Sequence, residues 1–416
     1  MGQKRGQKRV NEIGEILRKN MREYEGKHRM TPKQRQVVNN IMNCRTKKMG
    51  GHILVCGECG ASEIVYNACK DRHCPNCGAF EKAQWLEEQK VWMLPINYYH
   101  IVFTIDHELN DIMWDNQKTM YNLLFKVVAR LLKKYGKEYL GGEVGFTMVM
   151  HTWGQTIQRH PHVHVIYTGG ALVKEGKKYR WQEAKETFLF PVVKLSQEFR
   201  EGYCKGVRWL MKKGRIGCRT RSGREAVKEW VEEKVRKAEQ KDWEVYIQKP
   251  QGGTENLVEY LGKYVFRTAI GNHRIVSYKK GEVVFNYYDN RDGGKQKEMK
   301  LSGEEFIRRL LSHVMPPRFH RVRHYGLHHS SARKKLKKVR EMLGLEPELP
   351  EVEKLKLVEW LMEILGVDED PRLCPKCGKG LMESVLEFGP VEGGKGALQL
   401  AFAPIIGKAY QWGVIG

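Results

Sequence analysis

The chain has 416 residues, of which 41% are hydrophobic, so it is long enough for two or three domains with at least one sizeable core. Its formal net charge of +24 favours a polyanionic partner, and nucleic acid is favoured over a membrane surface because basic residues are spread from Lys4 to Lys408. No run of about 18 apolar residues occurs and no apolar segment follows the N-terminal charges, so we expect neither a membrane span nor a signal peptide but a cytoplasmic protein.

The N-terminal segment, residues 1–30, is basic and poor in apolar residues, and we expect a flexible arm in which a short helix is allowed. Thr31 followed by Pro32 is typical of a helix start. A second segment, residues 31–92, therefore begins there, and its cysteines predict a zinc-binding, DNA-binding module.

Two Cys-x2-Cys pairs stand in this module, Cys56 with Cys59 and Cys74 with Cys77, separated by 14 residues. Neighbouring Gly and Pro residues provide the tight turns that let each pair present two thiolates to one ion. The spacing predicts a tetrahedral zinc site built from these four cysteines, because disulfides are rare in the cytoplasm.

Further potential ligands lie in the same short stretch: Cys44, His52, Cys69 and His73. Eight ligands would fill two tetrahedral sites. The sequence leaves open whether the module binds one zinc ion or two.

The pattern then becomes mixed over residues 93–275. We expect strands at 98–105, 145–152, 161–167 and 243–248, helices at 110–135 and from Thr254 onward, and a basic helical insertion at about 172–242. This order predicts an α+β domain, an antiparallel sheet with helices on one face.

His162 and His164 project to one face of the expected strand because side chains alternate with period two. Tyr260 and Tyr264 stand one turn apart on the expected helix. Two imidazoles, a cation and a phenolate suffice to break a phosphodiester covalently, with the tyrosine attacking phosphorus. Taken alone, each pair also fits ordinary packing of a strand or a helix face.

Three motifs in order carry a resemblance to a known family. They are Cys69-Lys-Asp-Arg-His-Cys-Pro-Asn-Cys77, then His151-Thr-Trp-Gly-Gln155 with His160-Pro-His-Val-His164, then Glu259-Tyr-Leu-Gly-Lys-Tyr264. Over about three quarters of the chain, the sequence resembles the IS91-family transposases of the HUH endonuclease superfamily. The resemblance implies a ferredoxin-like or RRM-like sheet and a nucleoid-associated, prokaryotic enzyme. It also implies nicking and rejoining of single-stranded DNA at transposon ends and in target DNA, through a 5′-phosphotyrosine intermediate in rolling-circle transposition.

The metal ligands are expected from chemistry and this resemblance together. His162 and His164 are expected to bind Mg2+ or Mn2+ as neutral imidazoles, with nitrogen ligands suiting Mn2+ better. Gln155 is the expected third ligand, because the strand before it returns beside the histidine strand. His151 and His160 are the alternatives.

The tyrosine helix is expected to carry the rest of the catalytic machinery. Lys263 and Arg267 lie beside the tyrosines and would stabilise phenolate or phosphate charge, although a solvated helix face would also contain them. Tyr260 is expected to attack first because apolar residues follow Tyr264, and the sequence leaves open whether both are needed.

The last part of the chain is less informative. Residues 276–330 predict a β-hairpin and helix, and residues 331–416 a helical region with one further pair, Cys374 and Cys377. Two thiols alone do not complete a tetrahedral site, so this pair would need histidines such as His328 or His329, or a second subunit.

Two other classes of protein remain alternatives. A rolling-circle replication initiator or relaxase would use the same chemistry, but the fused zinc module favours a transposase. A non-catalytic zinc-finger DNA-binding protein would explain the charge and the cysteines but leave the histidines and tyrosines without a role. The DNA ends, the target tetranucleotide and the oligomeric state, a homodimer among the options, are not readable from the sequence.

Overall fold

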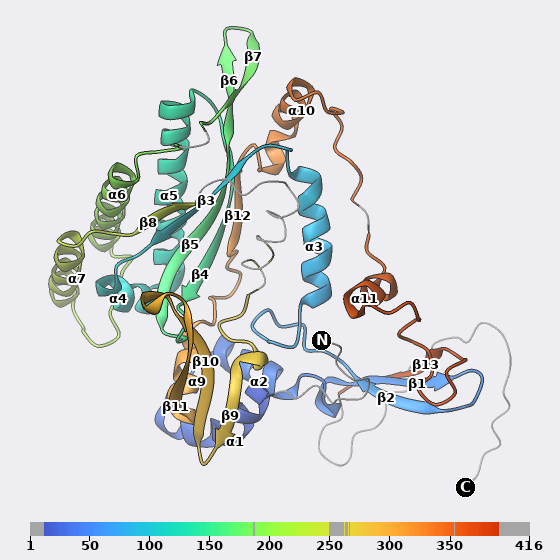
Figure 1. The fold of residues 1–416 in the computed structure, drawn as a ribbon. Helices are drawn as coiled ribbons and strands as arrows, with labels where there is room; N and C mark the ends of the chain where they lie inside the picture. Colours follow the sequence, from blue (N-terminus) through green and yellow to red (C-terminus); the bar gives the residue numbers. More distant parts are fainter. Residues whose placement is uncertain are drawn as a thin grey trace. The chain divides into compact units, whose positions relative to one another are not determined.

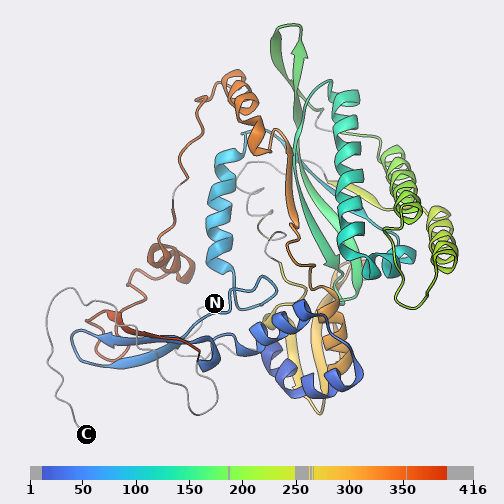
Figure 2. The same cartoon turned by 180° about the vertical axis from the view of Figure 1, so that it is seen from behind.

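The computed structural model describes residues 12–185, 188–248, 262, 265, 267–352 and 354–390. The chain divides into two compact units, both assembled from separate stretches of sequence (Figures 1 and 2). Unit 1 comprises Met1–Glu81, Gly271–Val283 and Lys354–Gly416, and unit 2 comprises Lys82–Ile270 and Val284–Glu353. No helix within the described residues has the length and apolar character of a membrane span.

Unit 2 is built on a five-stranded antiparallel sheet with the strand order β12-β4-β5-β3-β8 (Figure 1). Its strands are β3 (Tyr98–Thr104), β4 (Gly145–Trp153), β5 (Arg159–Thr168), β8 (Val245–Gln248) and β12 (Val322–Gly326). β4 and β5 form a hairpin, in which the strand before Gln155 returns beside the histidine strand as expected, and β5 lies between β4 and β3. The mixed α+β class with antiparallel pairing is confirmed.

One face of this sheet carries the main hydrophobic core. Phe103, Met148 and Val165 are fully buried there and belong to one cluster with residues of three helices: α5 (Gln117–Leu140), α6 (Val192–Lys212) and α7 (Arg224–Glu239). Figure 2 shows these helices together on one side of the sheet. The segment predicted to be an insertion therefore contributes to the core, because α6 and α7 each bury an apolar stripe against it.

The other face of the sheet is more polar, because side chains alternate along each strand. Thr147 and His151 of β4 lie on this face with the histidines of β5. Helix α3 (Ala79–Trp92) covers part of it, where Trp85 and Leu86 pack against Tyr98 and Ile166. The prediction of helices on one face only is therefore wrong, because apolar residues also occur on the second face.

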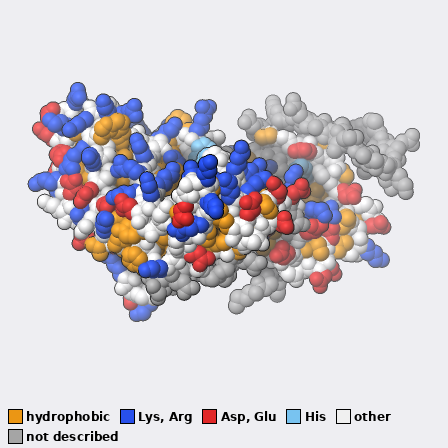
Figure 3. All heavy atoms as spheres, turned by 90° about the horizontal axis from the view of Figure 1, so that it is seen from above, with side chains coloured by type: hydrophobic (Ala, Val, Ile, Leu, Met, Phe, Trp, Pro, Cys, Tyr) orange, Lys and Arg blue, Asp and Glu red, His pale blue; other side chains and the backbone are white. Residues whose placement is uncertain are grey.

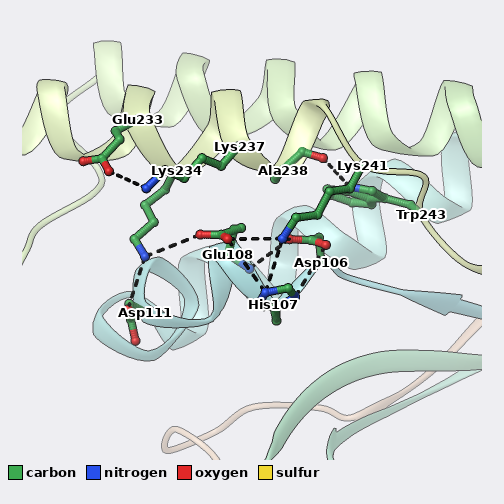
Figure 4. A network of polar contacts seen from close by, with 10 residues as sticks. All are labelled: Asp106, His107, Glu108, Asp111, Glu233, Lys234, Lys237, Ala238, Lys241 and Trp243. Atoms are coloured by element: carbon green, nitrogen blue, oxygen red, sulfur yellow. Dashed lines mark hydrogen bonds and ion pairs between the residues drawn. The ribbon is translucent and has the colours of Figure 1, made fainter. Parts of the chain in front are cut away.

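A polar network ties α7 to the segment after β3 (Figure 4). Asp106 caps the 3-10 helix η2 (His107–Leu109) by accepting a hydrogen bond from the backbone N–H of Glu108 at 2.9 Å. Lys241, just after α7, donates to the Glu108 carboxylate at 3.1 Å, and Lys234 of α7 lies 3.7 Å from it. Such partly exposed pairs contribute up to about 1 kcal/mol each. They hold the end of α7 close to the sheet edge at which β8 follows.

Shorter elements complete the described chain. They are α4 (Asn110–Asp115), the hairpin β6 (Gly170–Glu175) and β7 (Lys178–Glu183), the sheet β11-β10-β9 formed by β9 (Ile275–Lys279), β10 (Glu282–Asp289) and β11 (Lys295–Ser302), then α9 (Gly303–Ser312), α10 (Arg333–Met342), and the 3-10 turns η1 (Lys47–Met49), η3 (Asn272–Arg274), η4 (Asn290–Asp292) and η5 (Ser330–Ala332).

Unit 1 contains a three-stranded sheet in the order β13-β1-β2. β1 (Gly51–Cys56) pairs antiparallel with β2 (Ser62–Tyr66) on one side and with β13 (Met382–Phe388) on the other. The C-terminal region thus adds a strand to the cysteine-rich segment in addition to the helix α11 (Leu357–Leu365).

Helices precede this sheet. α1 (Glu12–Lys27) occupies most of the predicted arm, because Ile13, Ile16 and Leu17 fall on one helical face and are at most 1% exposed. α2 (Pro32–Asn43) begins where predicted: Thr31 accepts a hydrogen bond from the backbone N–H of Gln34, whose side chain accepts one from Thr31 in return.

Candidate active site and metal centres

Three histidines meet on the polar face of the unit 2 sheet. The β4–β5 register places His151 directly opposite His162, and His164 follows two residues later on the same face. One ring nitrogen from each lies within 4.8 Å of the others. His151 and His162 are 2% and 8% exposed, so the cluster is largely shielded from solvent. His151, one of the two alternatives to Gln155, is therefore beside the predicted pair.

Hydrogen bonds orient two of these rings. Nδ1 of His162 donates to the carbonyl oxygen of His160 at 2.6 Å, which leaves Nε2 as the lone-pair nitrogen. That Nε2 lies 3.1 Å from Nε2 of His164, as expected for two ligands about 2.1 Å from one ion. Nδ1 of His164 is 2.9 Å from Nε2 of His100, an outer partner of the kind that fixes a metal-binding imidazole.

His100 contacts this cluster, although the sequence indicated only a surface or packing residue at this position. It is on β3, and its ring stacks on that of His164 at 5.2 Å between centroids. Val102 of β3 lies opposite His164, and His100, two residues earlier, points to the same face of the sheet as Val102. Only this register could have indicated the contact. That register requires knowing that β3 and β5 are neighbours.

Burial keeps these imidazoles neutral. It lowers the pKa of His162 to about 3 and the pKa of His100 to about 4, and it holds the pKa of His164 well below its usual range. The positive charge of Arg267 acts in the same direction on the pKa of His162 and of His164. Neutral imidazole is the form that binds a metal ion.

The turn between β4 and β5 carries Gln155, the predicted third ligand. Two hydrogen bonds fix the backbone of this turn. Arg309 of α9 donates to the carbonyl of Thr156 at 2.9 Å, and His313, the residue after α9, donates to the carbonyl of Ile157 at 2.9 Å. Ile157 is fully buried with a φ of 59°, a conformation that a β-branched residue adopts only under constraint. The ligand role of Gln155 stays a prediction.

The predicted catalytic helix is described only in part. Tyr260, Lys263 and Tyr264 lie outside the described residues. Gly262 and Val265 are helical and buried, and a side chain at position 262 would collide with Leu86 and Lys82 of α3. Arg267, exposed at the end of this segment, is close enough for its charge to affect the pKa of His162 and of His164.

Eight cysteines of unit 1 form two clusters of four. The first cluster comprises Cys44, Cys69, Cys74 and Cys77. Its Sγ atoms are 3.5 Å apart between Cys44 and Cys77 and 3.7 Å apart between Cys69 and Cys77. Thiolates about 2.3 Å from one tetrahedral zinc ion are about 3.8 Å apart, so the donor set and its spacing fit zinc.

The second cluster joins Cys56 and Cys59 to Cys374 and Cys377. Sγ of Cys56 is 3.8 Å from that of Cys377, and Sγ of Cys59 is 3.7 Å from that of Cys374. The ladder between β1 and β13, in which Cys56 faces Met382, brings the two pairs together.

The predicted grouping of Cys56 and Cys59 with Cys74 and Cys77 is therefore wrong. Each Cys-x2-Cys pair has a different partner, because the β1–β2 hairpin separates the two pairs. The predicted completion of Cys374 and Cys377 by His328, His329 or a second subunit is also unnecessary, since Cys56 and Cys59 supply the two missing thiols.

The two histidines predicted as zinc ligands lie outside both clusters. Nδ1 of His52 is 3.3 Å from the Ser384 hydroxyl. Nδ1 of His73 is 2.8 Å from the Asp71 carboxylate, which also accepts from Asn40 at 2.9 Å. His73 and Asn40 lower the pKa of Asp71 despite its burial. His52 and His73 are close to the cysteines in sequence, which suggested that they bind zinc, but in the structure they contact Ser384 and Asp71 instead.

Comparison with known proteins agrees with this division into zinc-rich and histidine-bearing parts. Residues 16–105 match the family described as "Transposase zinc-binding domain", and residues 145–335 match the family described as "Putative transposase". No solved structure matches the chain.

Two curated relatives align over most of the sequence. "Putative transposase y4qJ" of Sinorhizobium fredii is 36% identical over 391 residues, covering 92% of this chain and 96% of the relative. "Transposase for insertion sequence element IS801" of Pseudomonas savastanoi pv. phaseolicola is 26% identical over 348 residues, covering 82% and 81%. With both family models in their expected order, this chain belongs to the IS91 family of transposases.

Proposed function

We propose that this transposase cleaves and rejoins single-stranded DNA in rolling-circle transposition, as an HUH endonuclease with a 5′-phosphotyrosine intermediate. The observation that carries the proposal is the cluster of His151, His162 and His164, three neutral nitrogen ligands on a sheet face. Arg267 adds a positive charge beside them.

The topology of unit 2 supports the same proposal. β3, α5, β4 and β5 follow one another, β5 inserts between β3 and β4, and β8 adds to the free edge of β3. A split β-α-β with a fourth strand at this edge is the arrangement of ferredoxin-like sheets. The histidines then lie on the central strand β5 and its neighbour β4.

His162 and His164 would hold Mg2+ or Mn2+, with His151 or Gln155 as the further ligand. A bound divalent ion would polarise the scissile phosphate and offset its developing charge. The chain itself orients the ligands: the carbonyl of His160 and the ring of His100 fix the two imidazoles. Arg267 stabilises negative charge on the phosphate.

Tyr260 is the proposed first nucleophile. Its oxygen forms a bond to phosphorus as the bond to the 3′ oxygen breaks; the phenol loses its proton and the departing 3′ oxygen gains one. The 5′ phosphate stays on the tyrosine until a 3′ hydroxyl attacks it. Tyr264, one helical turn away, is proposed to cut a second strand.

In unit 1 the two cysteine clusters are proposed to bind one structural zinc ion each. Four thiolates close a tetrahedral site without an open position, which is typical of structural zinc. For the second cluster, backbone N–H groups of Gly380 and Lys379 lower the pKa of the Cys377 thiol to about 6, which favours the thiolate.

A covalent-adduct assay tests the proposed reaction. Labelled single-stranded DNA carrying an element end is incubated with wild-type protein, Tyr260→Phe, Tyr264→Phe and the double variant, and adducts are resolved on denaturing gels. We expect the adduct to vanish in the double variant and to fall most in Tyr260→Phe. An adduct that persists in the double variant would contradict the mechanism.

A further inference from the structure

A large basic groove lies at the β12 edge of the unit 2 sheet. It has a volume of about 1270 Å³, and all five residues of β12 line it. β12 is an edge strand, paired with β4 within the described sheet. The groove thus follows an edge of the same sheet that carries the histidine cluster.

The lining of this groove is strongly positive. Its basic members come from four elements or their flanks: Lys133, Lys137, Lys174, Arg323 and Lys335. The acidic member is Glu143, which pairs with Lys335 at 2.5 Å. Figure 3 shows Lys and Arg as the commonest charged side chains on the face that carries the β6–β7 hairpin and α10. Lysines lining a groove of this charge favour an anionic polymer.

Aromatic rings stand among these charges. Lys133 lies over the Tyr325 ring at 5.6 Å, and Arg333 lies over the Trp92 ring at 5.4 Å. The ring of Tyr179 has Lys338 over it at 4.3 Å. Phosphate-binding cations interleaved with aromatic rings are the two components of a single-strand binding track, because unpaired bases can stack on the rings.

The groove also reaches the face of β4 that carries His151. Thr147 lines it and lies on the same face of β4 as His151, four residues or roughly 13 Å away. The Thr147 hydroxyl is 2.9 Å from Nδ1 of His324 and 3.0 Å from Nδ1 of His328, so it joins β4 to the groove wall.

We propose that this groove binds the single-stranded DNA that extends from the scissile phosphate, holding its backbone with lysines and its bases on Trp92 and Tyr179. The inference rests on the proposed function, because it places a substrate strand at that reaction centre. Duplex DNA fits less well, since its bases are stacked on one another and cannot lie on the rings.

The test compares two triple variants that remove the same charge. Lys133→Gln, Lys137→Gln and Lys174→Gln neutralise exposed lysines of the groove. Lys205→Gln, Lys212→Gln and Lys213→Gln neutralise exposed lysines of α6 and its end, which do not line the groove. Binding of a labelled oligothymidylate of about 24 nucleotides is followed by fluorescence anisotropy over a range of salt concentrations.

We expect the groove triple to reduce the slope of log affinity against log salt by about 2, because each single-strand phosphate contact contributes about 0.7. Affinity at low salt should fall about tenfold or more, while the α6 triple changes both quantities far less. Equal losses in the two triples would overturn the proposal in favour of diffuse charge. Unchanged affinity and slope in the groove triple would overturn it in favour of another partner, such as an acidic protein.

A second pair of variants tests stacking without changing charge. Tyr179→Ala should weaken oligothymidylate binding by about fivefold or more, while Tyr179→Phe should retain it, because the ring and not the hydroxyl stacks on a base. Equal affinity of both variants and wild type would contradict the base-stacking part. Thermal unfolding of each variant checks folding.

The proposed chemistry is tested apart from the groove. Wild-type protein that binds oligothymidylate through the groove but forms no adduct on any single-stranded element end would refute the nuclease and leave the groove standing. Adduct formation with no groove effect on binding would refute the groove alone.

Discussion

The cysteine clusters of unit 1 and the histidine cluster of unit 2 offer different ligand sets. Each cysteine cluster offers four thiols, which close a tetrahedral site. The histidine cluster offers three neutral nitrogens, which would leave positions of a bound ion free for phosphate oxygens. Under the proposed function, structural metal would lie in unit 1 and catalytic metal in unit 2, so variants in each unit can test the two roles separately.

The largest effect is expected from the histidines. His162→Ala with His164→Ala should reduce DNA nicking by about 1000-fold or more, because several kcal/mol of charge stabilisation are lost with the ion. Binding of single-stranded DNA should change little, because it rests on charge and stacking. Gel assays for nicking and anisotropy for binding separate these outcomes.

His107→Ala is the matched control, since the side chain of His107 is 72% exposed. His107 does not belong to the histidine cluster. Loss of nicking in this variant as well, or an equal loss of binding in the double histidine variant, would indicate a structural role for the histidines instead.

Cysteine substitution should affect folding of unit 1 more than chemistry in unit 2. Cys74→Ser and Cys377→Ser should each lower the zinc content by one ion per chain, and both should increase protease sensitivity in unit 1. Zinc binding of roughly 10–16 kcal/mol in small zinc domains is largely folding free energy, so its loss unfolds the local segment. Zinc analysis and limited proteolysis measure this.

The result that distinguishes the two clusters is additivity. The double variant should lose two ions, because the clusters share no ligand. A zinc ion that Cys74→Ser and Cys56→Ser each remove, and that Cys377→Ser leaves bound, would instead support the grouping predicted from sequence spacing.

Chelation should act on the two kinds of site at different rates. Brief treatment with EDTA should abolish nicking, and Mg2+ or Mn2+ should restore it, while zinc content stays constant because closed thiolate sites retain zinc tightly. If EDTA removed zinc and activity together, the ion at the histidines would be zinc itself or the clusters would be open.

The smallest effect is a pH dependence of stability within unit 2. Burial lowers the pKa of His328 to about 3, below its value in the unfolded chain, so the unfolded state takes up a proton first as pH falls. The free energy of unfolding should therefore decrease below pH about 6.5, by up to about 1.4 kcal/mol per pH unit, until pH falls to about 3.

Urea unfolding of wild type, His328→Gln and the exposed-site control His329→Gln, at about pH 7 and about pH 5, measures this slope. His328→Gln should be less sensitive to pH than the other two proteins. An identical slope in all three would show that His328 is not protonated differently in the folded and unfolded states.

Local patterns predicted much of the fold. The cap at Thr31, the strands around β3, β4 and β5, and the common face of His162 and His164 all depend on residues close in sequence. The sequence predicted His151 only as an alternative ligand to Gln155, because its position opposite His162 depends on the hairpin register.

Long-range pairing explains what sequence spacing did not predict. Cys59 and Cys374 are 315 residues apart and meet because β13 adds to β1. His100 contacts His164 only because β3 and β5 are neighbours. The assignments of the tyrosine helix and of Gln155 remain predictions from motif and chemistry.

The pairing of β13 with β1 also sets an order of events during synthesis. Cys56 and Cys59 leave the ribosome with half of a metal site, and 315 residues must be added after Cys59 before Cys374 follows. At about 5–20 residues per second, this interval lasts roughly 15–60 s, in which two thiols are open to oxidation or to foreign metals. A chain that ends before Cys374 lacks half of the ligands of the second cluster and the third strand of the unit 1 sheet.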